Sequence, residues 1–413
     1  MTRKRVAVTG VGTVSPLGVG TESTWKSLVS GESGAGPVTR FDATGYSTRI
    51  ACEVKDFDPT EFMDQRDARR SDRFTQFAVA SATEAAESAG WTTANIPYAR
   101  DRVGVVIGSG IGGIETLETQ HRVLLERGPS KMSPFTVPLL MINGAAGSVA
   151  MKYGLNGPNY AAVSACATGA HAIGEAAQMI RNGLAEAMLA GGSEAPITPL
   201  AYGAFACMGA LSRRNDDPTH ASRPFDADRD GFVIAEGAAV VVLEEWEAAT
   251  ERGAEILAEL VGYSATSDAF HLTQPDPEGA GAAGAMTKAI ADAGIDRKDV
   301  GYINAHGTST PFNDKIESKA IRDVFGADAP PVSSTKSATG HLTGAAGAIE
   351  AVFSIQAMVT KTLPPTINYE TADPECDLDY IPNAARTAEV EYVLSNSFGF
   401  GGHNACLLFK RAT

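Results

Sequence analysis

The sequence predicts an α/β fold built in two similar halves. Short apolar runs alternate with alanine-rich helical stretches over almost the whole chain, as they do in α/β proteins. The chain has 413 residues, which is long enough for two domains or for one large duplicated domain. The segment GAHAIGEA at residues 169–176 also loosely echoes GAAGAIEA at residues 344–351. We therefore expect an internal duplication, with halves at residues 1–253 and 254–413.

The first half is expected to begin with a buried strand at residues 5–12, followed by a helix at residues 22–30. Residues 31–58 are expected to be mostly irregular. The apolar run at residues 160–164 predicts a second buried strand, and Asn182-Gly183 is expected to end the helix that follows it. The other elements expected in this half are strands at residues 103–107, 186–191 and 232–243 and helices at residues 74–89, 167–181 and 244–253.

The second half repeats this alternation of strands and helices. It is expected to contain strands at residues 256–264, 300–305, 332–335 and 393–397 and helices at residues 279–293, 314–325 and 344–361.

A glycine-rich turn follows the strand expected at residues 103–107. Its sequence GSGIGG, at residues 108–113, formally matches the dinucleotide-binding pattern G-x-G-x-x-G. That pattern requires an acidic residue at the end of the next strand, about 20 residues further on. Here that distance falls in a helix-like, polar stretch at residues 116–128. We therefore favour a turn that lets the backbone approach another buried element over a nucleotide site.

Composition limits the kinds of partner and the location. The net charge of −15 disfavours nucleic acid as a partner. No run reaches the roughly 18 apolar residues that a membrane span needs, and the apolar run behind the basic first residues is too short for a signal peptide. Five cysteines without a C-x-x-C pair indicate a reducing compartment, so we expect a cytoplasmic protein.

Cys166 lies among small residues, at the junction between the strand expected at residues 160–164 and the following helix. At such a junction, unpaired amide groups and the helix dipole favour negative charge. They lower the pKa of a thiol and offer hydrogen-bond donors to an oxyanion. Cys166 is therefore a candidate nucleophile, and a buried structural cysteine is the alternative.

Three further stretches that carry reactive side chains also follow predicted strands. Carboxyl ends of strands are where open α/β sheets place their sites. Together with Cys166 they supply a thiol, two imidazoles, an ammonium group and a glycine-flanked loop, which is the set of groups that acyl transfer uses. The stretches are Asn304 to Thr310 (NAHGTST), Ser334 to His341 (STKSATGH) and Asn396 to His403 (NSFGFGGH).

The four stretches resemble the four signatures of the elongating β-ketoacyl-acyl-carrier-protein synthases. SACATG at 164–169, HGTST at 306–310, KSATGH at 336–341 and GFGG at 399–402 occur in the family's order. The resemblance implies a thiolase-like fold, with a duplicated five-layered αβαβα architecture, and a homodimer. Ile111 is similar to the bulky pocket residue of the family's type II branch.

The resemblance implies a decarboxylative Claisen condensation in fatty-acid elongation. Cys166 would take the acyl chain, and His306 and His341 would donate hydrogen bonds to the enolate that malonyl forms when it loses CO₂. The amides of Cys166 and Phe400 would hold the oxyanion. Lys336 would not touch substrate but would set the charge and orientation around His341 and Glu317. Glu317 and a second acidic residue, Asp314, would support the reactive groups.

The same resemblance implies several binding roles. The pantetheine arm of the carrier would bind Thr308 and Thr310, Ile111 would form a wall of the acyl pocket, and Phe400, flanked by Gly399 and Gly401, would act as a gate. No cofactor is required, because phosphopantetheine is carried by the partner. A structural monovalent cation is a weaker expectation, at Asn304, Glu350 and Asn396.

The expected partner is acyl-carrier protein, in its acyl and malonyl forms. It is acidic, so we expect it to dock on a local basic cluster, Arg66, Arg69 and Arg70. A solvated charged surface is the alternative for that cluster.

Three questions of function stay open at this stage. A non-catalytic partner subunit would lack the nucleophile, and a Cys-His hydrolase would need an acidic or amide residue orienting a single histidine. Polyketide ketosynthases share the Cys-His-His set, so the sequence separates them only weakly from fatty-acid enzymes. The sequence assigns no role to His403 and gives neither the acyl chain length nor the strength of the dimer.

Overall fold

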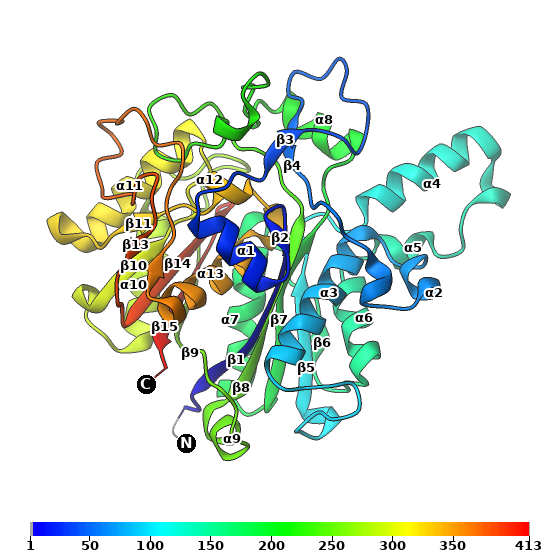
Figure 1. The fold of residues 1–413 in the computed structure, drawn as a ribbon, viewed down its shortest axis with the longest axis horizontal. Helices are drawn as coiled ribbons and strands as arrows, with labels where there is room; N and C mark the ends of the chain where they lie inside the picture. Colours follow the sequence, from blue (N-terminus) through cyan, green and yellow to red (C-terminus); the bar gives the residue numbers. More distant parts are fainter. Residues whose placement is uncertain (1–2, 413) are drawn as a thin grey trace.

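A large mixed β-sheet runs through the centre of the computed structural model, which describes residues 3–412 (Figure 1). Its strands are β1 (Val6–Ser15), β2 (Gly18–Val19), β5 (Val103–Gly108), β6 (Asn159–Tyr160), β7 (Ala187–Glu194), β8 (Gly237–Glu245), β9 (Ala258–Ser267), β10 (Val300–Asn304), β11 (Val332–Ser333), β14 (Tyr392–Gly399) and β15 (His403–Arg411). Two small sheets pair β3 (Ala35–Pro37) with β4 (Ile50–Cys52) and β12 (Thr362–Leu363) with β13 (Arg386–Thr387).

Helices cover and separate the parts of this sheet. They are α1 (Thr21–Val29), α2 (Gln65–Ala68), α3 (Arg73–Ser88), α4 (Ile114–Arg127), α5 (Thr136–Leu140), α6 (Gly144–Tyr153), α7 (Thr168–Arg181), α8 (Pro199–Cys207), α9 (Trp246–Glu251), α10 (Ala280–Ala293), α11 (Pro311–Phe325), α12 (Lys336–Thr339) and α13 (Ala346–Thr360). No helix among residues 3–412 is long and apolar enough to cross a membrane.

The strand order repeats within the sheet. One half runs β1-β8-β7-β5-β6 and the other runs β9-β15-β14-β10-β11. In each half the first two pairings are antiparallel and the last two are parallel. The halves are joined where Ala7 and Val8 pair with Glu259 and Ala258. The predicted duplication is therefore confirmed, and its repeat supports our proposal of a boundary at residues 253–254.

Five layers follow from this arrangement. Helices α7 and α13 pack against each other in the middle, α7 on β5 and β7 and α13 on β14 and β15 (Figure 1). Helices α3 and α6 cover the outer face of the first half, and α10 covers that of the second. Most residues of the central helices are buried between the two halves of the sheet, and α13 in particular is largely apolar.

The two central helices touch through small residues. A Cβ on Gly169 would lie 2.6 Å from the backbone nitrogen of Ala348, and a Cβ on Gly347 would lie 2.9 Å from that of Ala170. Glycine is needed at both positions for this close approach. The two contacts are reciprocal, so Gly169 corresponds to Gly347. The expected pairing of residue 169 with residue 344 is therefore wrong by three positions, because residue 169 corresponds to residue 347.

Several predicted elements differ from the structure. Residues 160–164 do not form a buried strand: β6 stops at Tyr160, on the edge of the sheet, and Tyr160 and Val163 are 38% and 54% exposed. The large apolar residues of this run therefore lie on the surface of the protein and not in its core. The strand expected from residue 232 begins at Gly237, because the buried residues before it make only isolated bridges, such as that between Ile234 and His341.

Candidate active site

Cys166 is presented by a strained turn at the start of α7. The preceding residue, Ala165, has a φ of +49°, a left-handed conformation that costs a non-glycine residue roughly 1–2 kcal/mol. The corresponding turn before α13 has the same feature, because Thr343 has a φ of +47°. Gly399 closes against this turn: a Cβ there would lie 3.0 Å from the backbone nitrogen of Cys166. The thiol is thereby fixed at the junction of the two halves.

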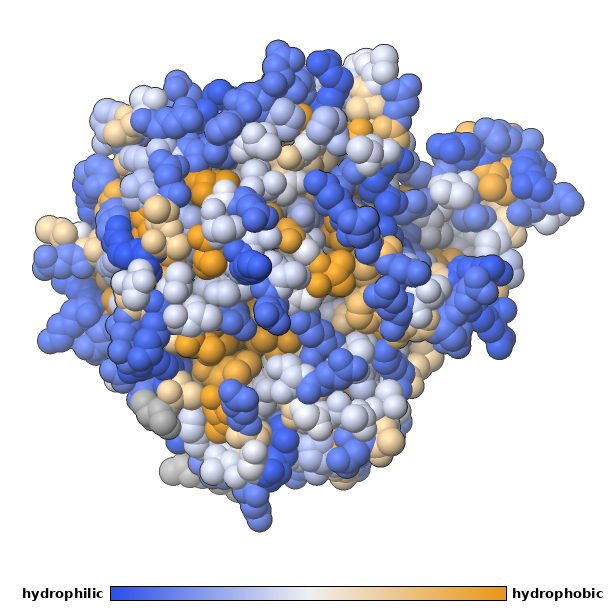
Figure 2. Space-filling model, viewed as in Figure 1, coloured by the Kyte–Doolittle hydropathy of each residue, from blue (hydrophilic) through white to orange (hydrophobic). Residues whose placement is uncertain are grey.

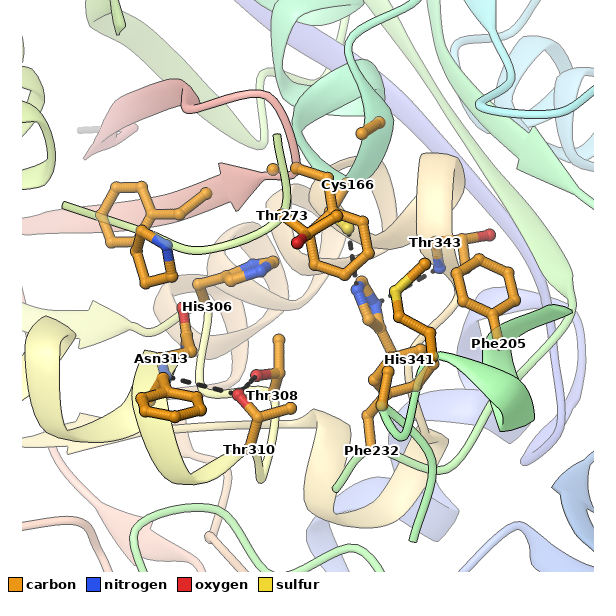
Figure 3. A pocket seen from close by; sticks show the side chains of 18 of the residues that line it. Cys166, Phe205, Phe232, Thr273, His306, Thr308, Thr310, Asn313, His341 and Thr343 are labelled. Atoms are coloured by element: carbon orange, nitrogen blue, oxygen red, sulfur yellow. Dashed lines mark hydrogen bonds between the residues drawn. The ribbon is translucent and has the colours of Figure 1, made fainter. Parts of the chain in front are cut away.

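Cys166 lies in a cavity of about 390 Å³ that both halves line. Figure 3 shows Phe205 and Phe232 on one side of the cysteine and Thr308 and Thr310 on the other. One side of the cavity is therefore apolar, and the other offers hydroxyl groups. Two histidines of the second half also line the cavity: His306 lies on the side of the threonines, and His341 lies beside Cys166, toward Phe232.

His341 contacts the nucleophile directly. Its Nε2 lies 3.0 Å from the Sγ of Cys166, and its Nδ1 accepts a hydrogen bond of 3.3 Å from the backbone N–H of Thr343. The side chain is buried, and burial together with the nearby Lys336 ammonium holds the pKa of the imidazole well below its ordinary value. The ring is therefore neutral at pH 7, with its proton on Nε2, facing the cavity.

His306 is held in a similar state by Lys336. The Nζ of Lys336 donates to the backbone carbonyl of His306 at 2.6 Å and lies 3.4 Å from its Nδ1. Burial, Lys336 and His341 lower the pKa of His306 well below its ordinary value. An ammonium group beside Nδ1 leaves the imidazole proton on Nε2. Both histidines thus present a neutral N–H to the cavity.

Lys336 itself pairs with Glu350 in the interior. Its charge acts on His341, which agrees with the expected role around that histidine. Among the described residues it forms no hydrogen bond or ion pair with Glu317, and its direct contact is with His306. Burial raises the pKa of Glu350 to about 7, and Lys336 opposes that shift.

The cysteine and the two histidines also match the types of a metal donor set, since one ligand atom from each lies within 4.8 Å of the others. A metal-bound histidine, however, donates a hydrogen bond from its other ring nitrogen to an acceptor. In this site both outer nitrogens face donors, Thr343 and Lys336. The arrangement suits hydrogen-bond donation into the cavity more than metal binding.

The expected lowering of the Cys166 pKa is wrong in direction. Burial raises the pKa of the thiol to about 11, although the Lys336 ammonium and the backbone N–H of Phe400, which donates to the sulfur, both oppose this rise. Desolvation in the cavity outweighs the effect of a helix N-terminus. The nucleophile is therefore a thiol at neutral pH.

Glu317 and Asp314 support the backbone that carries His306 and the threonines. Glu317 accepts from the N–H groups of His306 and Gly307, at 2.8 and 2.7 Å. Asp314 accepts from the N–H groups of Ser309 and Phe225. Both carboxyl groups are buried, and burial raises their pKa values.

The loop between β14 and β15 closes one side of the cavity and includes Phe400. The segment at residues 268–272, which no sequence motif marks, holds this loop. The N–H of Gly401 donates to the carbonyl of Leu272 at 2.7 Å, and the N–H of Asp268 donates to the carbonyl of Gly402 at 2.9 Å. Asn404 donates to Asp268 as well. The segment has no motif of its own, so the only signal was its place after β9.

His403, the first residue of β15, is exposed, and its ring lies beside Gly401. It is absent from the residues that line the cavity. The structure assigns it no chemical part in the site.

Ile111 lines the cavity, in the glycine-rich turn after β5. Glu194 fixes this turn, since it accepts from the N–H groups of Gly110 and Ile111 and from the hydroxyl of Ser109. Glu194 also accepts from Gly344 of the second half. Glu194 could not be predicted from the sequence, because a carboxylate at the end of a buried strand carries no pattern of its own.

Arg66, Arg69 and Arg70 lie outside the cavity, on and just after α2, and all three are exposed. The guanidinium of Arg70 lies 4.7 Å from the centre of the Phe135 ring. The three side chains form one basic surface cluster.

Two of the three residues proposed for a cation present free buried oxygens. Oδ1 of Asn304 and Oε2 of Glu350 have no hydrogen-bond partner among residues 3–412. The amide of Asn396 is engaged, since it donates to Glu317 and accepts from Cys406. The first two residues therefore offer oxygen atoms of the kind that a monovalent cation binds, whereas the amide of the third is already engaged.

Comparisons with known proteins agree with this geometry. The Beta-ketoacyl synthase N-terminal domain matches residues 3–249, and the Beta-ketoacyl synthase C-terminal domain matches residues 257–370. The chain is 51% identical to the 3-oxoacyl-[acyl-carrier-protein] synthase 2 of Synechocystis over 99% of this chain and 98% of that protein. It is also 51% identical to the Coxiella burnetii protein of that name, over 100% and 99% of the two chains.

Solved structures give the same result. A beta-ketoacyl synthase from Burkholderia phymatum aligns with a TM-score of 0.92 and 37% identity, over 99% of this chain and 100% of that one. A type II polyketide ketosynthase, solved with its acyl-carrier protein and bound to the hexaketide, aligns with a TM-score of 0.92 and 36% identity over 100% of both chains. With matching domains across both halves, the chain belongs to the beta-ketoacyl synthase family, and it has that family's thiolase-like fold.

Proposed function

We propose that this protein is a 3-oxoacyl-[acyl-carrier-protein] synthase that lengthens fatty-acyl chains by condensing them with malonyl-acyl-carrier protein. The observation that carries this proposal is the Cys166 thiol, 3.0 Å from the Nε2 of His341, with His306 beside it in one cavity. The identity of about half of all residues with two 3-oxoacyl-[acyl-carrier-protein] synthases 2 supports it.

The first step moves the acyl chain to the enzyme. The sulfur of Cys166 attacks the thioester carbonyl of the acyl-carrier, its proton ends on the released carrier thiol, and a thioester forms on Cys166. The N–H groups of Cys166 and Phe400 stabilise the oxyanion of this step. Each such donor is typically worth about 3 kcal/mol.

The second step forms the carbon–carbon bond. The bond from the malonyl methylene carbon to its carboxylate breaks, CO₂ leaves, and the electron pair forms an enolate whose oxygen accepts from Nε2–H of His306 and His341. The enolate carbon then attacks the acyl carbonyl on Cys166. The carbon–sulfur bond breaks, the 3-oxoacyl chain stays on the carrier, and the Cys166 thiolate regains a proton. Neutral N–H donors suit this step, because they stabilise the developing negative charge without being used up.

The cavity surroundings support the binding roles. Thr308 and Thr310, whose hydroxyl oxygens lie 2.9 Å apart on one side of the cavity, bind the amides of the pantetheine arm. The acyl chain lies on the apolar side, against Ile111. Phe400, between Gly399 and Gly401, moves to admit malonyl after acylation.

The partner is acyl-carrier protein, in its acyl and malonyl forms. A similar ketosynthase has been solved in complex with its acyl-carrier protein, which supports this assignment. Its phosphopantetheine arm belongs to the carrier, so the enzyme needs no cofactor of its own. Asn304 and Glu350 would hold a structural monovalent cation, which would supply positive charge to balance the buried carboxylate.

A second copy of the chain is the other partner. Tyr160 in the edge strand β6 and Val163 just after it are exposed, and an unpaired sheet edge is suited to pairing with another sheet. The arm formed by α4 and α5 projects from the body (Figure 1) and carries hydrophobic residues among charged ones (Figure 2). Leu125 and Val137 on this arm are 73% and 63% exposed. Both surfaces support a homodimer.

The five unpaired cysteines support a cytoplasmic location.

Two other functions fit the site less well. A non-catalytic partner subunit does not need the strained turn that presents Cys166. A hydrolase needs a histidine that accepts the thiol proton, whereas Nδ1 of His341 faces the Thr343 N–H and leaves the ring proton on Nε2. Polyketide extension would use the same groups, but the polyketide ketosynthase is only 36% identical to this chain.

The two half-reactions are expected to separate by mutation. Cys166→Ala should abolish acyl transfer and keep some malonyl decarboxylation, since the thiol serves only the first half-reaction. His306→Ala and His341→Ala should keep acylation of residue 166 and lose decarboxylation by about 100-fold or more. Intact-protein mass spectra measure the first reaction and CO₂ release measures the second. Equal loss of acylation in all three variants would contradict this division of labour.

The raised pKa of Cys166 predicts its alkylation by iodoacetamide as a function of pH. With a pKa of about 11, the thiolate fraction, and so the rate, should rise about tenfold per pH unit from about pH 7 to about pH 9 without a plateau. Lys336→Met removes a charge that lowers this pKa, so it should slow alkylation at each pH. Peptide mass spectrometry distinguishes Cys166 from the exposed Cys207. A plateau near the ordinary cysteine pKa would refute the shift.

The position of Ile111 predicts its effect on chain length. Ile111→Phe adds bulk that a packed cavity absorbs only with strain of about 1–3 kcal/mol. The kcat/KM for acyl chains of roughly eight carbons and longer should fall at least about tenfold, since about 1.4 kcal/mol corresponds to tenfold. The shortest acyl primers should be nearly unaffected. If every chain length slows equally, or if long chains keep the wild-type rate, Ile111 is not a wall of the acyl site.

The basic cluster predicts how the carrier docks. Reversing Arg66, Arg69 and Arg70 to glutamate should raise KM for carrier-bound substrates and weaken its dependence on salt. Thioesters of free pantetheine should be turned over as by the wild type, because they do not reach this surface. If activity falls equally with carrier-bound substrates and with thioesters of free pantetheine, the three arginines have a structural role and do not dock the carrier.

A further inference from the structure

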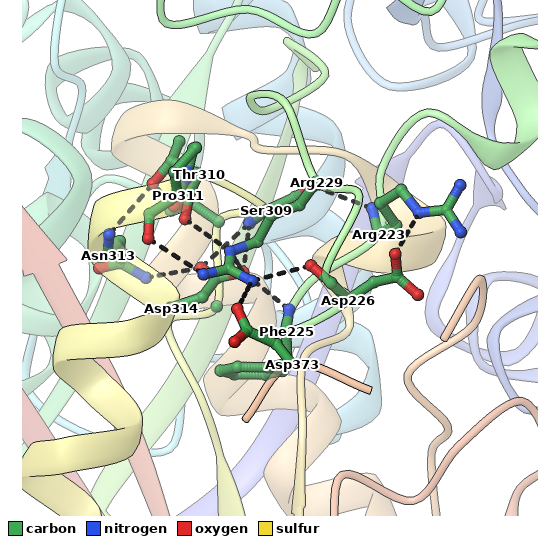
Figure 4. A network of polar contacts seen from close by, with 12 residues as sticks. Arg223, Phe225, Asp226, Arg229, Ser309, Thr310, Pro311, Asn313, Asp314 and Asp373 are labelled. Atoms are coloured by element: carbon green, nitrogen blue, oxygen red, sulfur yellow. Dashed lines mark hydrogen bonds and ion pairs between the residues drawn. The ribbon is translucent and has the colours of Figure 1, made fainter. Parts of the chain in front are cut away.

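A buried polar network lies behind the threonines of the cavity, and none of the steps above uses it. It joins the segment before β8 to the start of α11, so it links the two halves of the chain (Figure 4). Its central member is Arg229, whose side chain is only 5% exposed. A guanidinium is rarely buried to this degree without a specific set of partners.

The guanidinium of Arg229 donates hydrogen bonds to backbone carbonyls as well as to a carboxylate. Its Nε donates to the carbonyl of Thr310 at 3.2 Å, and its Nη2 donates to the carbonyl of Pro311 at 3.1 Å. Its Nη1 donates to the carbonyl of Asp226 at 2.8 Å and to the carboxylate of Asp373 at 2.6 Å. One rigid group therefore holds two consecutive carbonyls of the loop that carries Thr310.

That loop has an unfavourable conformation at its centre. Ser309, between Thr308 and Thr310, has a φ of +67°, which non-glycine residues adopt only when their surroundings impose it. Because of this turn, Thr308 and Thr310 both line the cavity, with their hydroxyl groups 2.9 Å apart. The spacing of the two hydroxyls thus depends on the contacts that keep Ser309 in place.

Segment 223–231 supplies those contacts together with Asp314. The backbone N–H of Arg223 donates to the Oγ of Ser309 at 2.9 Å, and the N–H of Gly231 donates to its carbonyl at 3.1 Å. The N–H of Ser309 donates to Asp314 at 3.1 Å. Arg229 is the one cation of this network beside Asp314, with Nε 3.8 Å from its carboxylate.

We propose that Arg229 is a positioning residue for pantetheine binding: it fixes the strained loop at Ser309 so that Thr308 and Thr310 face the pantetheine arm together. This inference rests on the proposed role of the two threonines. Arg229 does not touch substrate; it acts through the carbonyls of Thr310 and Pro311 and through the charge it places beside Asp314.

Arg229→Lys is the central test, because lysine keeps the charge and loses the planar fork that reaches both carbonyls. It should raise KM for acyl-carrier substrates and for thioesters of free pantetheine at least about tenfold, with kcat changed less than about threefold. Alkylation of Cys166 by iodoacetamide, which has no pantetheine arm, should stay within about twofold of the wild-type rate.

A matched control separates this effect from a general loss of stability. Arg181 is also buried, pairs with Asp292 at 3.3 Å and donates to the carbonyl of Leu260, but it lies at the far end of α7 from Cys166. Arg181→Lys should lower the melting temperature by a similar amount and leave both KM and alkylation unchanged. Asp373→Asn is the milder variant, because it weakens one ion pair of Arg229 and leaves the other contacts of the guanidinium in place. It should raise KM about threefold, and it provides a test even if Arg229→Lys does not fold.

The possible outcomes are distinct. If KM is unchanged in a folded Arg229→Lys variant or in Asp373→Asn, the positioning role is overturned. It is also overturned if the rate of Cys166 alkylation falls by the same factor by which KM rises. Thr308→Val separates this failure from failure of the proposed function. If Thr308→Val raises KM and the Arg229 variants do not, only the positioning role is wrong; if Thr308→Val leaves KM unchanged, the pantetheine site itself is wrong.

Discussion

The buried ammonium of Lys336 is the charge on which the rest of the site depends. Removing a lone ammonium from water costs several kcal/mol, and the ion pair with Glu350 and the hydrogen bond to the carbonyl of His306 offset that cost. The same charge lies beside Nδ1 of His306, and after burial it is the next cause of the lowered pKa values of both histidines. It also opposes the rise in the pKa of Cys166. One side chain thus acts on the pKa values of all three reactive groups: it adds to the effect of burial at the two histidines and opposes it at Cys166.

The duplicated fold explains why the reactive groups meet. Each half has a strained turn before its central helix, at Ala165 in the first half and at Thr343 in the second. The first turn presents the thiol of Cys166. The second gives its backbone N–H to Nδ1 of His341. The same local geometry therefore supplies a nucleophile in one half and fixes a histidine tautomer in the other, and the close packing of α7 on α13 brings the two together.

Much of this could be predicted from the sequence, because strand ends and glycine-flanked motifs are local signals. His306 and His341 follow predicted strands and Cys166 precedes a predicted helix, and the structure places all three in one cavity. The pKa direction of Cys166 could not be predicted, since it depends on burial by distant segments. The partner of Lys336 also depends on packing, because Glu350 lies on α13 and carries no motif. Residues 160–164 were misassigned because an apolar run at a sheet edge looks like one in its interior.

The central claim is that both imidazoles are neutral and carry their proton on Nε2, which makes them donors to the enolate. Nitrogen-15 NMR of the protein labelled at histidine measures this directly, with His306→Ala and His341→Ala to assign the signals. At about pH 7, both rings should show a protonated Nε2 and an unprotonated Nδ1. An imidazolium at either position, or a proton on Nδ1, would contradict the account.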